Sequence, residues 1–194
     1  MAQKTAVVLG HPDPGPSYCR ALAEAYESGA RRGGREARRI DIAALDIEFL
    51  RHAEDFRSGQ PSEGIRGAQE TIAWAEHLVV LYPLWHGTMP ALLKAFFEQC
   101  FRPGFALDYG TGNGWPRPLL AGRSARVVIT MAMPALAYRW YYGAHSLKSL
   151  ERNVLSYSGI KPVRETLIGY VHRLPETKRR RWLARLEELG TKGA

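Results

Sequence analysis

Cysteine and long apolar runs are both scarce in this chain, and each scarcity argues against a class of protein. Cys19 and Cys100 are the only cysteines and form no CxxC motif, so neither a disulfide framework nor a cysteine zinc site is indicated. The six histidines show neither HxH nor HExxH spacing, and we expect no metal. No apolar run approaches the roughly 20 residues of a membrane helix, and the opening MAQKTAVVLGHPD lacks a signal-peptide pattern. We therefore expect a cytoplasmic protein without an integral membrane segment.

Negative charge is also in short supply, since the formal net charge is +8. Much of the excess lies in residues 31–39 (RRGGREARR) and 178–188 (KRRRWLARLEE). A basic balance can serve a nucleic acid, an anionic membrane or a phosphorylated ligand. Because the aromatic interleaving of a single-strand binder is missing, we expect solvated helix ends and no nucleic-acid partner. Peripheral docking of residues 178–181 (KRRR) on a membrane partner is the alternative.

Apolar runs and helical patterns alternate along the chain. A short apolar run is followed by a helical pattern five times, which predicts a parallel sheet covered on both faces. The length suits one domain, so we predict a single domain over 1–194. Residues 43–64 resist assignment, and 102–120 indicate a loop. The predicted strands are 4–10, 35–43, 77–83, 124–131 and 163–171, and the predicted helices are 17–33, 65–77, 90–101, 144–159 and 175–190.

Three of the connecting loops are expected to share one ligand-binding edge. In a five-stranded parallel sheet ordered 2-1-3-4-5, the loops after the first, third and fourth strands meet there. These are residues 11–19, 83–90 and 131–145. The first loop leads into a helix at Ser17, whose unpaired amides attract a phosphate, although Ser17 could simply cap its own helix. Since the loop is neither GxGxxG nor GxxxxGK, a Rossmann dinucleotide site and a P-loop are disfavoured.

The second loop is apolar, aromatic and stiffened by Pro83 and Pro90. Its main-chain groups cannot all pair locally, so they are available to the polar edge of a planar ring. Trp85 or His86 could then pack near the face of that ring. The alternative is that Trp85 and Met89 simply fill the core.

The third loop carries Tyr138 and His145 within an aromatic cluster. Both side chains can donate a proton or a hydrogen bond to a carbonyl that is being reduced, although a lone histidine is more often structural. A phosphate cradle, a flat aromatic slot and a donor-bearing loop together fit flavin mononucleotide, FMN.

The same loops, with their neighbouring elements, carry a family resemblance. GHPDPGPSYCRALAEAY (10–26), HLVVLYPLWHGTMPALLKAFFEQCFRPGFALDY (77–109) and SARVVITM (124–131) resemble the NAD(P)H:quinone oxidoreductase family. That family also includes flavin-binding ancillary subunits of bacterial potassium-efflux systems. The resemblance implies an α/β protein, a flavodoxin-like three-layer sandwich with a five-stranded parallel sheet in the order 2-1-3-4-5. It also implies a homodimer whose helix 90–101 touches the partner.

The function implied is an enzyme that passes two electrons from NAD(P)H through a bound flavin to a quinone or similar acceptor. The cofactor is expected to be FMN, with FAD as the alternative, because the chain is short and nothing is set aside for adenosine. The alternative function is a flavin-binding regulatory subunit of a membrane transporter.

By the same resemblance, Tyr138 and His145 would stabilise the reduced flavin or a reduced quinone oxygen. The chain departs from the family pattern in three places: Cys19 stands where Asn is common, MAMP (131–134) replaces a glycine-rich turn, and the spacing around Tyr138 and His145 differs slightly. The resemblance assigns flavin contacts to His11, Ser17, Tyr18 and Cys19 around the phosphate, to Pro83, Leu84, Trp85, His86 and Gly87 on one side of the ring, and to Thr130, Met131, Ala132 and Met133 on the other.

Overall fold

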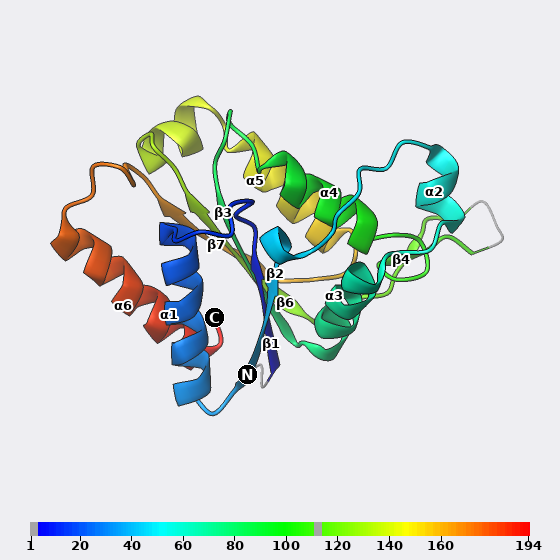
Figure 1. Cartoon of the computed structure of the whole chain (residues 1–194), viewed down its shortest axis with the longest axis horizontal. Coiled ribbons are helices and arrows are strands. Elements are labelled where there is room, and N and C mark those ends of the chain that lie inside the picture. Colours follow the sequence, from blue (N-terminus) through cyan, green and yellow to red (C-terminus); the bar gives the residue numbers. More distant parts are fainter. Residues whose placement is uncertain (1–3, 111–113) are drawn as a thin grey trace.

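A parallel sheet of five strands forms the middle layer of the molecule (Figure 1). The computed structural model describes residues 4–110 and 114–194, so the first three residues of the predicted domain and 111–113 of the predicted loop lie outside it. The strand order β2-β1-β3-β6-β7, with parallel neighbours, confirms the predicted order 2-1-3-4-5. The strands are β1 (Lys4–Leu9), β2 (Glu36–Asp41), β3 (His77–Pro83), β6 (Ser124–Thr130) and β7 (Val163–Ile168).

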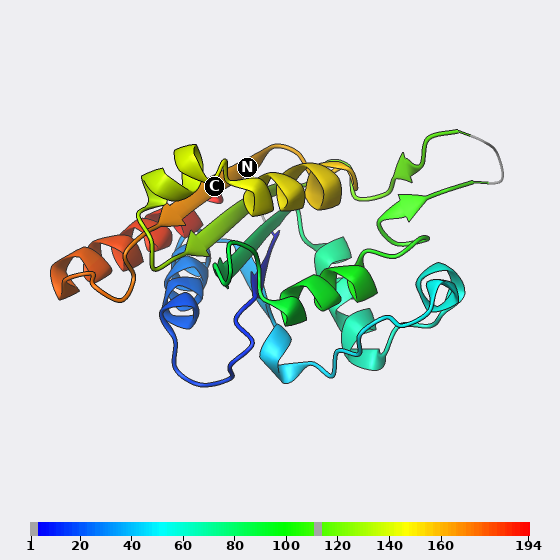
Figure 2. The same ribbon diagram turned by 90° about the horizontal axis from the view of Figure 1, so that it is seen from above.

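Helices cover both faces of this sheet and complete the predicted three layers (Figures 1 and 2). One face packs against α1 (Tyr18–Arg32) and α6 (Glu176–Lys192), which bury Leu22, Tyr26 and Leu186 with the sheet. The other face packs against a second set of helices through a larger apolar core. That set comprises α3 (Glu63–Trp74), α4 (Ala91–Cys100), α5 (His145–Ser149) and the π-helical turn η3 (Leu150–Ser156).

Helix α1 forms where the sequence pattern predicts it. The Ser17 hydroxyl accepts a hydrogen bond from the Arg20 amide at 3.2 Å, which makes Ser17 the N-cap. Leu22, Tyr26 and Ala30 recur at helical spacing and are buried. The helix ends at Gly33. Its first turn therefore stands at the carboxyl end of β1, at the edge where the predicted loops converge.

The connections hold more structure than the sequence indicates. The unassigned stretch 43–64 contains the end of a 3₁₀ turn, η1 (Ile42–Ala44), and a short helix, α2 (Ala53–Ser58), that buries none of its side chains. The predicted loop 102–120 contains a two-stranded ladder, β4 (Leu107–Asp108) with β5 (Arg117–Pro118). Propensity alone does not reveal elements this short, because only a few hydrogen bonds define each of them.

The contact between α1 and α6 is close enough to exclude any side chain at two positions. A Cβ on Gly29 would lie 1.8 Å from the carbonyl oxygen of Glu187, and a Cβ on Gly190 would lie 2.1 Å from the carbonyl oxygen of Tyr26. These distances are far below van der Waals contact, so only glycine lets the two backbones approach. The pair fixes where the first turns of both helices stand at the ligand-binding edge.

A buried histidine lies at the opposite, amino-terminal end of the strands. His77 begins β3, is fully buried, and places Nδ1 2.8 Å from the Ser124 hydroxyl oxygen. Burial, and then the positive charges of Arg126, Arg164 and Arg35, lower the pKa of His77 to about 4. The folded protein therefore holds this ring neutral at every pH near neutrality.

We expect this histidine to make stability depend on pH. In the unfolded chain its pKa returns to about 6.5, so the unfolded state binds the extra proton between that value and pH 4. The contribution is fully present above pH 6.5 and is lost as the pH falls toward 4. The expected loss between pH 7 and pH 5 is about 2 kcal/mol in the free energy of unfolding, measured by urea titration.

The matched variant is His77→Gln, which keeps a polar side chain but cannot titrate. Its free energy of unfolding should change between pH 7 and pH 5 by about 2 kcal/mol less than that of the wild type. An identical pH dependence in the two proteins would show that His77 is not the group responsible.

Candidate functional site

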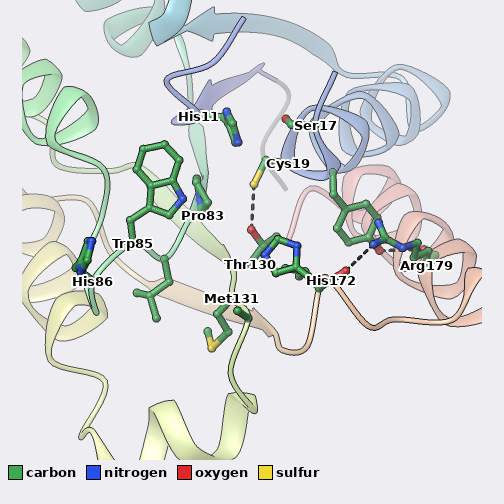
Figure 3. Close-up of a pocket in the computed structure, with 14 residues that line it drawn as sticks. His11, Ser17, Cys19, Pro83, Trp85, His86, Thr130, Met131, His172 and Arg179 are labelled. Carbon is green, nitrogen blue, oxygen red and sulfur yellow. Dashed lines mark hydrogen bonds between the residues drawn. The ribbon is translucent and has the colours of Figure 1, made fainter. Parts of the chain in front are cut away.

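A cavity of about 520 Å³ opens at the carboxyl ends of β1, β3 and β6 (Figure 3). It collects all the predicted flavin-contacting residues except Gly87 and Met133. It also includes three residues that were not predicted as flavin contacts: Val171 and His172, which follow β7, and Arg179 in α6. The lining consists of His11, Ser17, Tyr18 and Cys19, of Pro83, Leu84, Trp85 and His86, of Thr130, Met131 and Ala132, and of Val171, His172 and Arg179.

The first loop is held by hydrogen bonds between its own side chains and amides. The Asp13 amide donates to Nδ1 of His11 at 3.2 Å, and the Gly15 amide donates to Oδ1 of Asp13 at 2.7 Å. With Nδ1 accepting, a neutral His11 ring carries its proton on Nε2. That ring lies edge-on to Trp85 of the second loop, with 6.0 Å between ring centroids. The two loops thus face each other across the cavity mouth.

Ser17, at the start of α1, is both a helix cap and a cavity residue. Tyr18 and Cys19 follow as the first helical residues and line the cavity too. The first amides of a helix have no partner within the helix and favour negative charge. This corner of the cavity therefore suits an anionic group.

A thiol and a hydroxyl connect the first loop with the end of β6. Sγ of Cys19 lies 3.1 Å from Oγ1 of Thr130, and both side chains are buried at the cavity floor (Figure 3). Burial raises the pKa of Cys19 to about 11, against the smaller opposing effect of the Thr130 hydrogen bond. The thiol is neutral at physiological pH, so it offers a phosphate no repulsion and acts as a weak polar contact.

Cys19 should consequently be unreactive in the folded protein. At pH 8 roughly a thousandth of a thiol with this pKa is ionised, and burial blocks access as well. Cys100 is also buried, and burial raises its pKa. An aromatic disulfide reagent should label neither thiol in the native protein and both after denaturation. Rapid labelling of one thiol in the native protein would contradict the assigned environment of Cys19.

The second loop is a tight hairpin turn, and its tryptophan is not core filler. Trp85 and Thr88 exchange two backbone hydrogen bonds of 2.9 Å, and both residues between them have positive φ, 47° at His86 and 79° at Gly87. The Leu84 amide donates to the Thr130 carbonyl at 2.8 Å. Fewer main-chain amides are available to a ligand than predicted. In a two-residue hairpin turn only the two central amides, here those of His86 and Gly87, stay outside the hydrogen bonds of the turn itself.

Trp85 and Met89, two bulky side chains of this loop, differ in burial. Trp85 is 46% exposed and forms a wall of the cavity, as the ligand-binding interpretation predicts. Met89 is buried in the core, as the alternative interpretation predicts.

The third loop is tied to the segment after β7 by a short series of backbone hydrogen bonds. The Val171 amide donates to the Met131 carbonyl at 3.1 Å, and the Tyr170 amide donates to the Met133 carbonyl at 3.1 Å. A Cβ on Gly169 would lie 2.6 Å from the Ala135 nitrogen, so the two segments touch. This contact carries Val171 and His172 into the cavity wall. Sequence reasoning missed them because it considered the loops after only three strands.

Arg179 is the one residue of the basic cluster 178–181 that turns into the cavity. Its guanidinium lies 4.9 Å from the centre of the Tyr18 ring and donates to the Val171 carbonyl at 2.5 Å. The Tyr18 hydroxyl donates in return to the Arg179 carbonyl at 3.1 Å. Arg179 thus supplies a cation beside the start of α1, which the sequence interpretation of a solvated helix end overlooked.

The predicted catalytic pair is not brought to this cavity. Tyr138 is buried in the core, where its hydroxyl lies 2.8 Å from the Ser146 hydroxyl and accepts from the Leu147 amide at 3.1 Å. His145 is exposed at the start of α5. The spacing of these residues suggests a shared edge, but the π-helical turn η2 (Ala137–Tyr141) rotates Tyr138 inward toward its hydrogen-bond partners.

We searched residues 4–110 and 114–194 for a metal site and for a membrane-spanning helix and found neither. No group of three or more His, Cys, Asp or Glu side chains there could hold a metal ion. Nor is any helix in that part of the chain long and apolar enough to cross a membrane.

Known proteins resemble this chain over most of its length. A protein of Haemophilus influenzae named as an NAD(P)H oxidoreductase is 27% identical over 178 residues, which cover 90% of this chain and 87% of that protein. An FMN-dependent NADH:quinone oxidoreductase of Ruegeria pomeroyi is 28% identical over 143 residues, 66% of this chain and 69% of that protein.

Solved structures show the same fold at lower identity. An NAD(P)H:quinone oxidoreductase from Methanothermobacter marburgensis superposes with a TM-score of 0.80 at 22% identity, covering 99% of this chain and 97% of that one. An FMN-dependent NADH-azoreductase of Bacillus anthracis, solved with FMN, gives a TM-score of 0.75 at 16% identity and covers 98% of both chains. The family model described as a flavodoxin-like fold matches residues 3–190. With nearly its whole length matched and the sheet order as expected, the chain belongs to the family with the flavodoxin-like fold.

Proposed function

We propose that this chain is a flavin-dependent oxidoreductase that takes electrons from NAD(P)H onto bound FMN and passes two of them to a quinone or similar acceptor. The observation that carries the proposal is the cavity, in which an anion-binding corner, an aromatic wall and the end of β6 enclose one space. Relatives named for FMN-dependent quinone reduction support the same reading. FAD is the alternative cofactor.

The residues present fit the phosphate of FMN. The first turn of α1 and the Ser17 hydroxyl supply hydrogen-bond donors, and Arg179 supplies a positive charge on the adjacent wall. The Cys19 thiol is neutral, so the replacement of a more polar residue there removes one donor without adding repulsion. We assign the phosphate to this corner of the cavity.

The remaining lining fits a flat ring system. Trp85 forms one wall, and His86 of the hairpin turn lines the cavity beside it, so we assign the polar edge of the ring to this turn. Met131 and Ala132 close the other side, with Met133 immediately behind them in the chain. When bound, FMN supplies the redox chemistry by accepting a hydride equivalent and releasing two electrons, while the protein orients it and excludes water.

The reduced acceptor needs a proton donor at the cavity. Of the predicted pair, Tyr138 is occupied by Ser146 and the Leu147 amide, which gives it a positioning role for the start of α5. We assign proton donation instead to the imidazoles that line the cavity, those of His11 and His172. His145 is exposed at the start of α5 and does not line the cavity, so we give it no role in this step.

Location and oligomeric state are two further parts of the proposal. We place the protein in the cytoplasm and propose a homodimer. In this proposal α4 is the helix that touches the partner; since its Phe96 and Phe97 are buried in the core of the chain itself, the contact would use the exposed side of the helix, which carries Ala91 and Lys94. The transporter-subunit alternative draws no support from the relatives described above, which are named for oxidoreductase activity. Light scattering during size-exclusion chromatography would measure the oligomeric state.

Steady-state kinetics test the proposed function. With one cavity serving NAD(P)H and acceptor in turn, double-reciprocal plots at several fixed acceptor concentrations should give parallel lines. Intersecting lines would show that both substrates bind together and would count against a single shared slot. No turnover by FMN-loaded protein with any quinone would remove the enzymatic proposal itself.

A further inference from the structure

The first loop (residues 11–17, HPDPGPS) has both of its ends in the cavity wall. His11 and Ser17 line the cavity, and Figure 3 labels both side chains. The loop alternates prolines with other residues, and proline fixes φ but leaves ψ free and carries no amide hydrogen. The Asp13 and Gly15 amides are already used inside the loop, by Nδ1 of His11 and Oδ1 of Asp13. These two bonds shape the loop, but they do not attach it to a neighbouring strand or helix.

Arg20 attaches this loop to the end of a neighbouring strand. Its Nε donates to the Gly15 carbonyl at 3.4 Å, and its Nη1 lies 2.7 Å from Oδ2 of Asp41, the last residue of β2. Asp41 is itself fixed, because its Oδ1 accepts a hydrogen bond from the Ala43 amide at 3.2 Å and caps η1. Only 20% of each charged side chain is exposed, so water screens this ion pair less than a surface pair. One guanidinium thus joins the loop, α1 and β2.

The position of Arg20 in its helix is electrostatically unfavourable. Arg20 lies in the first turn of α1, where the unpaired amides and the helix dipole favour a negative side chain. The turn contains no acidic residue, and Asp41 compensates the charge of Arg20 from outside the helix. Arg20 does not line the cavity either. The two contacts of its side chain therefore account for an arginine at this position, and direct contact with a ligand does not.

We propose that Arg20 and Asp41 are positioning residues for the phosphate of the cofactor, because their ion pair holds the first loop in its binding conformation before the cofactor binds. The inference rests on the proposed function, which assigns the phosphate to the corner at Ser17. A loop that is already ordered loses little conformational freedom on binding, so its ligand binds more tightly. The same contacts keep His11 beside Trp85 and keep the proton of a neutral His11 on Nε2.

A second ion pair joins the same two elements and provides a matched control. Nε of Arg39 in β2 lies 2.6 Å from Oε1 of Glu27 in α1, and Nη2 donates to Oε2 of the same carboxylate at 3.0 Å. Glu24, the other acidic partner of Arg39, is also in α1. Arg39→Met therefore removes an ion pair between α1 and β2 and leaves the attachment of the first loop intact.

Backbone order parameters from NMR relaxation test the proposal on the protein without cofactor. In the wild type, the Asp13 and Gly15 amides should have the values of rigid backbone, about 0.85. In Arg20→Met they should fall below about 0.6, the range of flexible segments, while methionine keeps the apolar part of the side chain. In Arg39→Met they should stay at the wild-type values. This measurement needs no flavin and no turnover.

Titration with FMN, followed by flavin fluorescence, measures the consequence for binding. Arg20→Met should raise the Kd for FMN at least about tenfold. Arg39→Met should change it by less than about twofold. The same Arg39 variant should lower the midpoint of urea unfolding, because it leaves the buried carboxylate of Glu27 with less compensation.

Asp41→Asn separates positioning from direct contact with the phosphate. The Oδ1 of asparagine can still accept the Ala43 amide, but the charge that fixes Arg20 is gone. If the pair positions the loop, this variant binds FMN more weakly than the wild type. If Arg20 instead turns to the phosphate itself, removal of Asp41 frees it, and FMN binds as tightly as before or more tightly.

Three results would overturn the proposal. The first is unchanged order parameters for Asp13 and Gly15 in Arg20→Met. The second is an equal loss of FMN affinity in Arg20→Met and Arg39→Met, which would assign the effect to the general contact between α1 and β2. The third is undiminished FMN affinity in Asp41→Asn. If the wild type binds no FMN while the loop loses order in Arg20→Met, the proposed function fails and the role of the pair in holding the loop stands.

Discussion

Replacing Arg179 with methionine is expected to weaken FMN binding by roughly 10- to 100-fold and to leave riboflavin binding nearly unchanged. Arg179 lines the corner of the cavity beside Ser17 and the start of α1, where we assign the phosphate. A charge-assisted hydrogen bond to that phosphate would be lost, while methionine retains most of the packing on Tyr18. Quenching of flavin fluorescence in titrations with each ligand measures both dissociation constants.

Riboflavin separates loss of a phosphate contact from loss of structure. Arg179 also holds the segment after β7 through the Val171 carbonyl, and disturbing that segment would weaken both ligands equally. The neighbouring Arg180→Met is the matched control, because Arg180 is exposed and pairs with Glu176 away from the cavity. Equal weakening of FMN and riboflavin in the Arg179 variant would contradict the phosphate assignment.

Replacing Gly29 with alanine should lower the free energy of unfolding by about 2–4 kcal/mol. The added Cβ would meet the Glu187 carbonyl oxygen at 1.8 Å, and backbone atoms cannot move aside without separating α1 from α6. The intrinsic helix preference of alanine works in the opposite direction but is worth only about 1 kcal/mol. Urea unfolding followed by circular dichroism gives the difference.

The matched control for this prediction is Gly67→Ala in the middle of α3. A Cβ there meets nothing within 4 Å, so the same chemical change should stabilise the protein by up to about 1 kcal/mol. Opposite signs for the two variants are the signature of the helix contact. A neutral or stabilising Gly29→Ala would mean that α1 and α6 do not approach as closely as described.

The fold follows from the sequence because its signals are local and repeated. Five apolar runs, each followed by a helical pattern, predict a parallel sheet between two layers of helices. The N-cap at Ser17 is predictable from its residue type and its position before the helical pattern. Helix α2 and the β4–β5 ladder are not predictable in this way, since they bury little and depend on contacts between short segments. The α1–α6 contact is likewise hidden, because nothing in the sequence marks Gly29 and Gly190 as neighbours.

The site was predictable where a loop follows its strand directly. The segments after β1, β3 and β6 line the cavity as expected, because the carboxyl ends of parallel strands meet at one edge. The sequence did not predict Arg179 and His172 as cavity residues. They follow β7, and backbone hydrogen bonds between the segments after β6 and β7 bring this part of the chain to the cavity. Tyr138 was expected at the cavity from linear spacing, which does not register the rotation that a π-helical turn introduces.

The most direct test of the central claim is the visible absorption spectrum of the purified protein incubated with FMN and then with NADH or NADPH without oxygen. We expect bound, oxidised flavin whose absorption is bleached by NADH or by NADPH and restored by added quinone. Flavin released by heat and identified by chromatography would distinguish FMN from FAD. A protein that stays colourless with both flavins, or holds a flavin that neither nucleotide reduces, would contradict the account.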